Sequence, residues 1–155
     1  MRLWHYSLIP YLPDSQLKGQ WRECSLISVS LKKNNTPNHI LVNRITDYGI
    51  DDYYTYCYFV EVEMNMRKFN ITYKSKEKVY NSLFAFKRSD EPFELRVGVN
   101  GPIFSGWHNK EYLRVCMANL YEKYKFAKGK SKISEIEWKR LLEGYETITH
   151  EEYVV

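Results

Sequence analysis

A single carboxylate in the N-terminal third is the first side chain whose type and position could support acid–base chemistry. Glu23 follows Arg22 in the middle of a stretch with helical periodicity. On such a helix it shares a face with Gln16, Gln20 and Ile27, which is a face of mixed polarity. Two interpretations stay open from these residues alone, an ordinary helix glutamate and a functional carboxylate, and the ordinary one is the commoner.

Four histidines are the next candidates, because imidazole can bind a metal or transfer a proton near neutral pH. They are His5, His39, His108 and His150. No two of them have the i, i+4 helical spacing of a zinc motif, so separate hydrogen-bonding roles are favoured over a metal site. The sequence also lacks a GxSxG motif, a glycine-rich phosphate loop and a carboxylate cluster for magnesium. It therefore predicts no metal site and no cofactor.

The composition is that of one globular domain and leaves the partner open. At 155 residues the chain can bury one substantial core, so a single domain over residues 1–155 is expected. Aromatic residues make up 16% of the chain, and each is either a core residue with a polar tip or a surface on which a base can stack. Core packing is the more frequent role. The net charge of +4 permits a polyanionic partner without requiring one.

Cysteine use and hydropathy indicate the compartment. Cys24, Cys57 and Cys116 are far apart, odd in number and embedded in apolar helical patterns, so buried free thiols in a reducing environment are expected. The N-terminus lacks the apolar stretch of a signal peptide, and no window is long enough to cross a bilayer. The sequence therefore predicts a cytoplasmic protein without a membrane partner.

Apolar residues at helical spacing predict five helices. The expected ranges are 14–31, 50–64, 76–86, 110–124 and 134–145. Asp14 is the expected N-cap of the first helix, and Ser134 and Glu137 have the spacing of a capping box at the start of the last. The predicted fold class is mainly α, a single compact domain of about five helices with long irregular loops.

The longest of these loops is the segment 90–108, which is rich in proline and glycine. Leu95, Val97 and Val99 alternate with polar or small residues, a pattern that would suit a short strand. A segment of this length without helix is often functional in a small domain, and an ordinary packed loop would have the same composition.

The opening residues carry a specific resemblance. Residues 1–24, MRLWHYSLIPYLPDSQLKGQWREC, resemble the start of the phage endonuclease V family, the pyrimidine-dimer DNA glycosylases. They look closer still to a group of small bacterial proteins of that superfamily, which begin Met-Arg-Leu-Trp-His and continue with Leu-Ile-Pro-x-Leu-Pro and Leu-x-Gly-Gln-x-Arg-Glu. Shorter pieces at 36–43, 47–48, 106–109 and 112–114 resemble the same group, so the match extends to about Trp138. The resemblance implies an endonuclease V-like helical fold.

The same resemblance implies a mechanism. In the characterised enzymes the α-amine of the first residue is the nucleophile, an arginine follows it, and an arginine–glutamate pair on the first helix completes the site. Carried over to this chain, these residues are Met1, Arg2, Arg22 and Glu23. An α-amine has a pKa of about 7.7–8.0, against ~10.4 for lysine, so a useful fraction is neutral near pH 7. The implied activity is that of a DNA glycosylase with AP-lyase activity, acting on damaged or modified bases in double-stranded DNA without a metal or cofactor.

Further residues in the resembling segments are expected to contact the substrate. They are Arg2, His5, Gln20, Trp21, His39, Trp107 and His108. A histidine at such a site can contact a base edge or shuttle a proton, and a tryptophan can stack on an extruded base. A monomer is the favoured oligomeric state.

Three departures from the family pattern keep two other functions open. Arg2 normally prevents removal of the initiator methionine, and Leu26 stands near the place of a phosphate-binding arginine. The tail at 151–155 is acidic where the family's is aromatic and basic. A non-catalytic nucleic-acid-binding protein that keeps the glycosylase fold is one alternative. A regulator that binds a small ligand or a protein in a histidine-lined pocket is the other.

Overall fold

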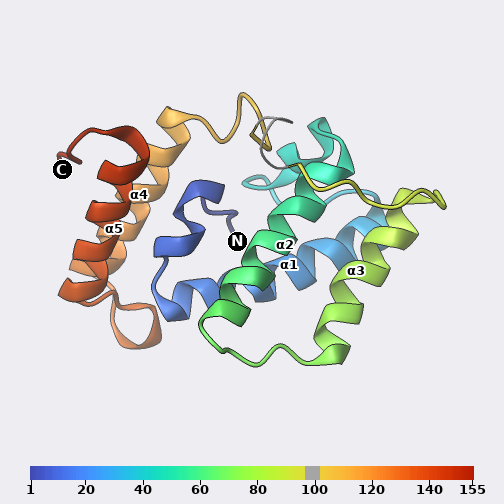
Figure 1. Cartoon of the computed structure of the whole chain (residues 1–155), viewed down its shortest axis with the longest axis horizontal. Helices are drawn as coiled ribbons and strands as arrows, with labels where there is room; N and C mark the ends of the chain where they lie inside the picture. Colours follow the sequence, from blue (N-terminus) through green and yellow to red (C-terminus); the bar gives the residue numbers. More distant parts are fainter. Residues whose placement is uncertain (97–101) are drawn as a thin grey trace.

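The apolar stripes of the sequence form five α-helices in the computed structural model, which describes residues 1–96 and 102–155 (Figure 1). They are α1 (Asp14–Asn34), α2 (Ile50–Met66), α3 (Tyr73–Lys87), α4 (Lys110–Lys125) and α5 (Glu135–Thr149). Three short 3-10 helices accompany them: η1 (Tyr6–Tyr11), η2 (Asn43–Asp47) and η4 (Gly129–Ser131). The described residues contain no strand. The predicted mainly helical fold class is therefore confirmed.

Local hydrogen bonds explain where the helices begin and end. The capping box of Ser134 and Glu137 is formed as predicted. The predicted cap at Asp14 is wrong, because Asp14 is the first helical residue and its carboxylate pairs with Arg67 at 3.0 Å instead. Helix α3 begins earlier than expected, because the Thr72 hydroxyl caps it by accepting a hydrogen bond from the Ser75 amide at 3.1 Å.

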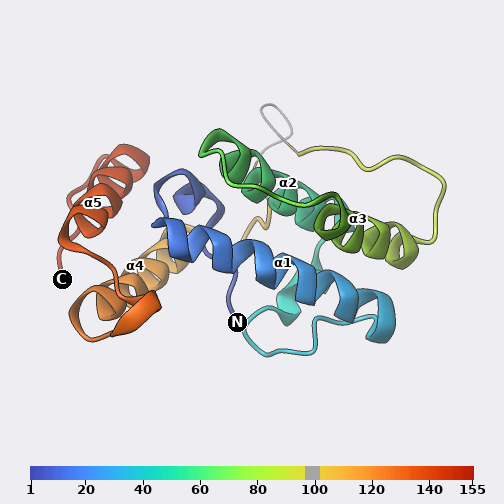
Figure 2. The same ribbon diagram turned by 90° about the horizontal axis from the view of Figure 1, so that it is seen from below.

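The helices form two groups with the N-terminal segment between them. Helix α1 packs against α2 and α3, and α4 packs against α5. Helix η1 contacts both α2 and α5, so residues 1–12 lie between the two groups (Figures 1 and 2). Leu3, Leu8 and Leu12 of this segment are fully buried. The segment is thus a central part of the core and not a free terminus.

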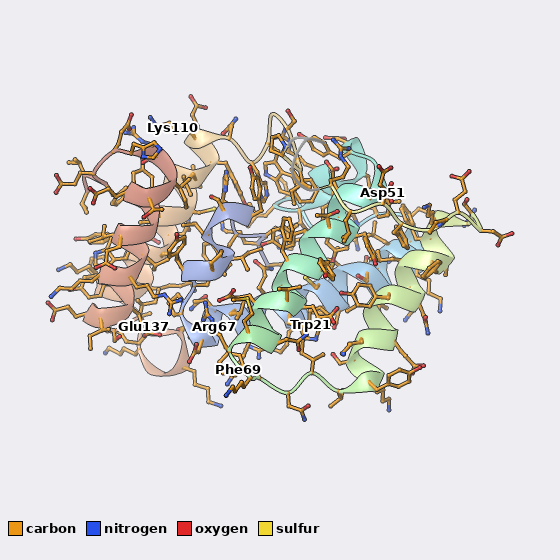
Figure 3. The ribbon with its side chains drawn as sticks, in the orientation of Figure 1. Trp21, Asp51, Arg67, Phe69, Lys110 and Glu137 are labelled. Carbon is orange, nitrogen blue, oxygen red and sulfur yellow. The ribbon has the colours of Figure 1, made fainter. Side chains whose placement is uncertain are left out.

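Arginine side chains fix the C-terminal end of this segment. The Arg67 guanidinium at the end of α2 donates to the Leu12 carbonyl at 2.6 Å and the Pro10 carbonyl at 3.1 Å (Figure 3). Arg140 on α5 donates to the same Pro10 carbonyl at 2.8 Å. The Tyr11 ring lies so close to Gly144 that a Cβ there would be 2.4 Å from its Cγ, so only glycine allows this approach of η1 to α5.

The segment 90–108 is tied to the start of α2. The Asp52 carboxylate accepts a hydrogen bond from the Phe104 amide at 2.9 Å and faces the Arg96 guanidinium at 3.3 Å. Of the predicted strand, Leu95 has irregular backbone, while Val97 and Val99 lie outside the described residues.

The structure also bears on the predictions about the cysteines and about membrane-spanning helices. The three cysteines, Cys24, Cys57 and Cys116, are free and buried, as expected. Within the described residues no helix is long and apolar enough to cross a membrane.

Candidate functional site

A pocket of about 260 Å³ opens beside the N-terminus. Its walls come from the first residues of the chain, from α1, from the loop that follows α1, and from α4. They are Met1, Arg2, Trp4, Gln16, Gly19, Gln20, Glu23, Leu41, Asn119 and Lys123. The sequence-predicted residues Met1, Arg2, Gln20 and Glu23 are therefore brought together, and we call this space the Met1 pocket.

Glu23 is the carboxylate of the Met1 pocket. It reaches the pocket because Gln16, Gln20 and Glu23 follow one another along one face of α1. Its Oε2 atom is buried and has no hydrogen-bond partner among the described residues. A buried carboxylate oxygen without a partner is costly, and such atoms occur where a site awaits a ligand or does chemistry.

Met1 lies on the wall of the same pocket and is 38% exposed. Within residues 1–96 and 102–155, neither its α-amine nor Glu23 forms an ion pair. Met1 and Glu23 thus line one pocket, and within the described residues neither the amine nor the carboxylate is held in an ion pair.

Gln20 holds the backbone that leads to Met1. Its Oε1 accepts a hydrogen bond from the Trp4 amide at 2.9 Å, and its Nε2 donates to the Arg2 carbonyl at 3.0 Å. The Tyr56 hydroxyl lies 2.9 Å from the same Oε1 and 2.7 Å from the Trp4 carbonyl. Gln20 is 1% exposed. The sequence predicts Gln20 as a substrate contact. In the structure its side-chain oxygen and nitrogen instead bond to the backbone of Trp4 and Arg2 and position the N-terminus.

Arg2 flanks the pocket from the side of α4. Its guanidinium carbon lies 5.9 Å from the centroid of the Trp4 ring. Burial raises the pKa of Tyr112, while the nearby Arg2 guanidinium acts in the opposite direction. The Tyr112 hydroxyl donates to the Leu3 carbonyl at 2.5 Å, which fixes the backbone next to Arg2. Arg2 is thus a cation held at the edge of the pocket.

Arg22 lies outside the Met1 pocket because successive helix residues point about 100° apart. Its guanidinium covers Gly19, with Nη2 3.5 Å from the position that a Cβ there would take. It lines two grooves on the exposed side of α1, one of which shares Gln16, Gly19 and Lys123 with the Met1 pocket. The cations of these grooves, which we call the basic surface, are Lys18, Arg22, Lys74, Lys78, Lys123 and Lys130.

The basic surface is available to an anion. None of its six cations pairs with a carboxylate within the described part of the chain. The one acidic residue in its two grooves, Asp14, already pairs with Arg67. Unpaired cations on one side of a fold attract polyanions.

The tryptophans predicted to contact substrate lie away from the Met1 pocket. Trp21 points toward α3, where its indole nitrogen donates to the Ser75 hydroxyl at 2.8 Å, and it is 5% exposed (Figure 3). Trp107 is 4% exposed and packs its ring on Phe104 and His108. Both are core residues in this structure, and Trp4 is the tryptophan that lines the pocket.

His5 of the N-terminal segment and His108 form a buried pair, with ring centroids 5.2 Å apart. His5 Nε2 donates to the His108 carbonyl at 2.9 Å, and His5 Nδ1 accepts from the Ser7 amide at 3.2 Å. His108 Nδ1 accepts from the Tyr6 amide at 3.1 Å. Burial lowers the pKa of His5 to about 4 and that of His108 well below its usual value. Both imidazoles are therefore neutral at pH 7 and tie the segment down.

Because His5 and His108 are buried as neutral imidazoles, we expect the protein to lose stability in mild acid. The unfolded histidines bind protons below pH ~6.5, whereas folded His5 does so only near pH 4, so the free energy of unfolding falls as the pH decreases between these values. For His5 the expected loss is on the order of 3 kcal/mol. Urea denaturation at several pH values measures it. A His5→Asn variant should show a flatter pH dependence, and an unchanged slope would contradict the assignment.

His39 belongs to the loop after α1 and stands apart from this pair. Its Nδ1 accepts a hydrogen bond from the Leu41 amide at 3.2 Å, and its own amide donates to the Asn43 side chain at 2.9 Å. Neither the Met1 pocket nor the grooves of the basic surface contain a histidine. Nothing in these spaces supports the histidine-lined pocket of the regulator alternative. In the described residues, no group of three or more histidine, cysteine or acidic side chains could hold a metal.

Sequence reasoning missed the residues that α4 and the loop after α1 contribute. Asn119 and Lys123 enter the Met1 pocket together because they are one helical turn apart on α4, and Leu41 enters from the loop. No motif marks them. The helical spacing of 119 and 123 was visible, but only the packing of α4 beside the N-terminus shows its use.

The fold and the pocket define a small helical domain that presents its own N-terminus and a buried carboxylate beside an exposed basic surface. The family model for pyrimidine dimer DNA glycosylase matches residues 1–77, which include α1, α2 and the start of α3. Residues 1–77 therefore match this family, which confirms the resemblance of the opening residues. No curated protein and no solved structure matches the chain.

Proposed function

We propose that this protein is a DNA glycosylase with AP-lyase activity that acts on damaged or modified bases in double-stranded DNA. The carrying observation is that Met1 and Glu23, both within the family match, line one pocket in which the Glu23 Oε2 atom has no partner. The basic surface supports DNA as the partner, because its cations can neutralise backbone phosphates beside that pocket.

The reaction follows from the amine and the carboxylate. The neutral Met1 amine attacks the sugar C1′ with its lone pair, the bond from C1′ to the base breaks, and the base leaves with the bonding electrons and takes up a proton. Loss of a proton from nitrogen and opening of the sugar ring give an imine. Removal of a 2′ proton then expels the 3′ phosphate and cuts the strand, after which water releases the enzyme. Glu23 stabilises the positive charge that develops on the sugar and accepts protons.

Two neighbouring cations favour this chemistry. Arg2 lines the pocket next to Met1, and Lys123 lines it from α4. Both cations attract the phosphates that flank the target nucleotide and so hold the substrate at the pocket.

Borohydride trapping tests the proposal. Protein whose N-terminus has been verified by mass spectrometry is mixed with duplexes carrying an abasic site or a pyrimidine dimer, and borohydride then reduces any imine to a stable adduct. We expect an adduct whose cross-linked peptide begins at Met1. Acetylation of the Met1 amine should abolish it. Lys123→Arg serves as the control, because it removes the other amine of the pocket and should leave the Met1 adduct in place.

The other outcomes distinguish the alternatives. Salt-dependent DNA binding by the intact protein without an adduct would indicate a non-catalytic nucleic-acid-binding protein. Absence of binding at low salt would contradict the assignment of DNA as the partner.

A further inference from the structure

Two consecutive apolar side chains are exposed at the rim of the Met1 pocket. Ile40 is 86% exposed and Leu41 is 44% exposed. Single exposed apolar residues are ordinary on protein surfaces, and Ile136 on α5 is 81% exposed in the same way. The pair differs because Leu41 is part of the pocket wall beside Met1 and Glu23. Ile40 is therefore presented next to the proposed reaction centre.

The loop that carries Ile40 is held by its own hydrogen bonds. The His39 carbonyl accepts from the Val42 amide at 3.0 Å and the Asn43 amide at 2.9 Å. The Asn43 side chain accepts from the His39 amide, and the His39 ring accepts from the Leu41 amide. Val42 is fully buried and anchors the loop in the core. These bonds hold the backbone of the loop in place, while the Ile40 side chain is exposed.

The position of the loop indicates what Ile40 would meet. The chain leaves the far end of α1 and returns along it to the N-terminus (Figure 2). The wall formed by Leu41 faces the same pocket as Lys123, which also belongs to the basic surface. A nucleic acid that neutralises the basic surface would therefore lie beside the pocket whose wall includes Leu41, the neighbour of Ile40. This charge pattern favours a polyanion over a protein or a lipid tail.

We propose that Ile40 is a wedge that enters the base stack of the bound duplex and fills the gap left by the nucleotide drawn into the Met1 pocket. Apolar side chains inserted between base steps are a general means of unstacking and kinking DNA, and enzymes that act on a base in a duplex commonly extrude its nucleotide. Isoleucine suits this task because its branched side chain is stiff. Leu41 is its neighbour on the pocket wall. The inference rests on the proposed function, because the wedge has a purpose only beside a site that takes up a nucleotide.

The wedge is tested by comparing double-stranded with single-stranded substrate. Ile40→Ala should lower the rate of imine trapping on a duplex abasic site by at least about tenfold, because the duplex resists extrusion. On single-stranded abasic DNA the same variant should match the unchanged protein, because no stack has to be opened. Ile136→Ala, which removes an equally exposed isoleucine far from the pocket, should leave both rates unchanged.

A second readout separates failure of the wedge from failure of the proposed function. The fluorescence of a 2-aminopurine base beside the target position increases when that base is unstacked. The increase requires DNA binding but no chemical step. We expect brightening with the unchanged protein and its loss with Ile40→Ala. If Ile40→Ala lowered the trapping rate equally on duplex and single-stranded DNA, the wedge would be contradicted. Equal 2-aminopurine brightening by Ile40→Ala and the unchanged protein would contradict it too, even if trapping succeeds. If the unchanged protein forms no adduct, the proposed chemistry fails, and the fluorescence alone decides the wedge.

Discussion

Replacing Glu23 by glutamine should lower the rate of strand cleavage about 10²–10⁴-fold, the range associated with positioned acid–base groups. Glutamine has the same shape but carries no charge, so it can neither stabilise the positively charged sugar nor accept a proton. DNA binding should remain, because the basic surface is untouched. The variant should also be at least as stable as the unchanged protein, because its substitution removes a buried carboxylate oxygen that has no partner.

Single-turnover cleavage of an abasic duplex measures this effect. Glu143→Gln on α5 provides a matched control, since it removes the same charge at an exposed position outside the Met1 pocket. Thermal unfolding of both variants shows whether the fold is kept. Cleavage by Glu23→Gln within about twofold of the unchanged protein, well short of the loss expected for such a group, would remove Glu23 from the mechanism.

Gln20→Leu should have the largest effect on stability. The leucine keeps most of the buried volume but leaves the Trp4 amide and the Arg2 carbonyl without partners. Each unsatisfied buried group costs about 1–3 kcal/mol, so for the two groups a loss of roughly 2–6 kcal/mol in the free energy of unfolding is expected. Urea denaturation monitored by tryptophan fluorescence measures the loss, because Trp4 and Trp21 both lie near the substituted residue.

The control for this prediction is one helical turn away. Gln16 lines the same pocket and its side chain makes no hydrogen bond within the described residues, so Gln16→Leu should change the stability by less than about 0.5 kcal/mol. Equal stabilities of the two variants would show that the bonds from Gln20 to residues 2 and 4 do not hold the N-terminus. Under conditions where Gln20→Leu stays folded, its imine trapping should still be slower, because the Met1 amine is no longer positioned.

The helices could be predicted from the sequence because their signals are local. Apolar spacing located all five, and the capping box at Ser134 marked the start of α5 correctly. Asp14 was misassigned because its carboxylate has a better partner in Arg67, which is 53 residues away and invisible to a local pattern. The early start of α3 at Tyr73 depends on Thr72, whose hydroxyl accepts a hydrogen bond from the Ser75 amide.

The candidate site could be predicted only in part. The opening motif identified Met1, Arg2 and Glu23, which the structure places around one pocket. It also singled out residues that the structure uses for other purposes, such as His5, whose bonds hold the N-terminal segment in place. A motif records which residues occur together, and hydrogen bonds between distant segments decide which of them face a ligand.

The partners of the N-terminal segment also determine when the proposed reactive amine becomes competent during synthesis. The His5 amide bonds to the Cys116 sulfur and the Tyr6 amide to the His108 ring, across sequence separations of 111 and 102 residues. The Pro10 carbonyl, besides its bond from Arg67, accepts a hydrogen bond from Arg140 across 130 residues. The N-terminal segment therefore reaches its final position only after α4 and α5 have been made, because closing such long loops requires both helices to be present. A chain without α4 and α5 therefore carries the amine but not the site, and the amine gains its proposed reactivity only once both helices have packed against the segment.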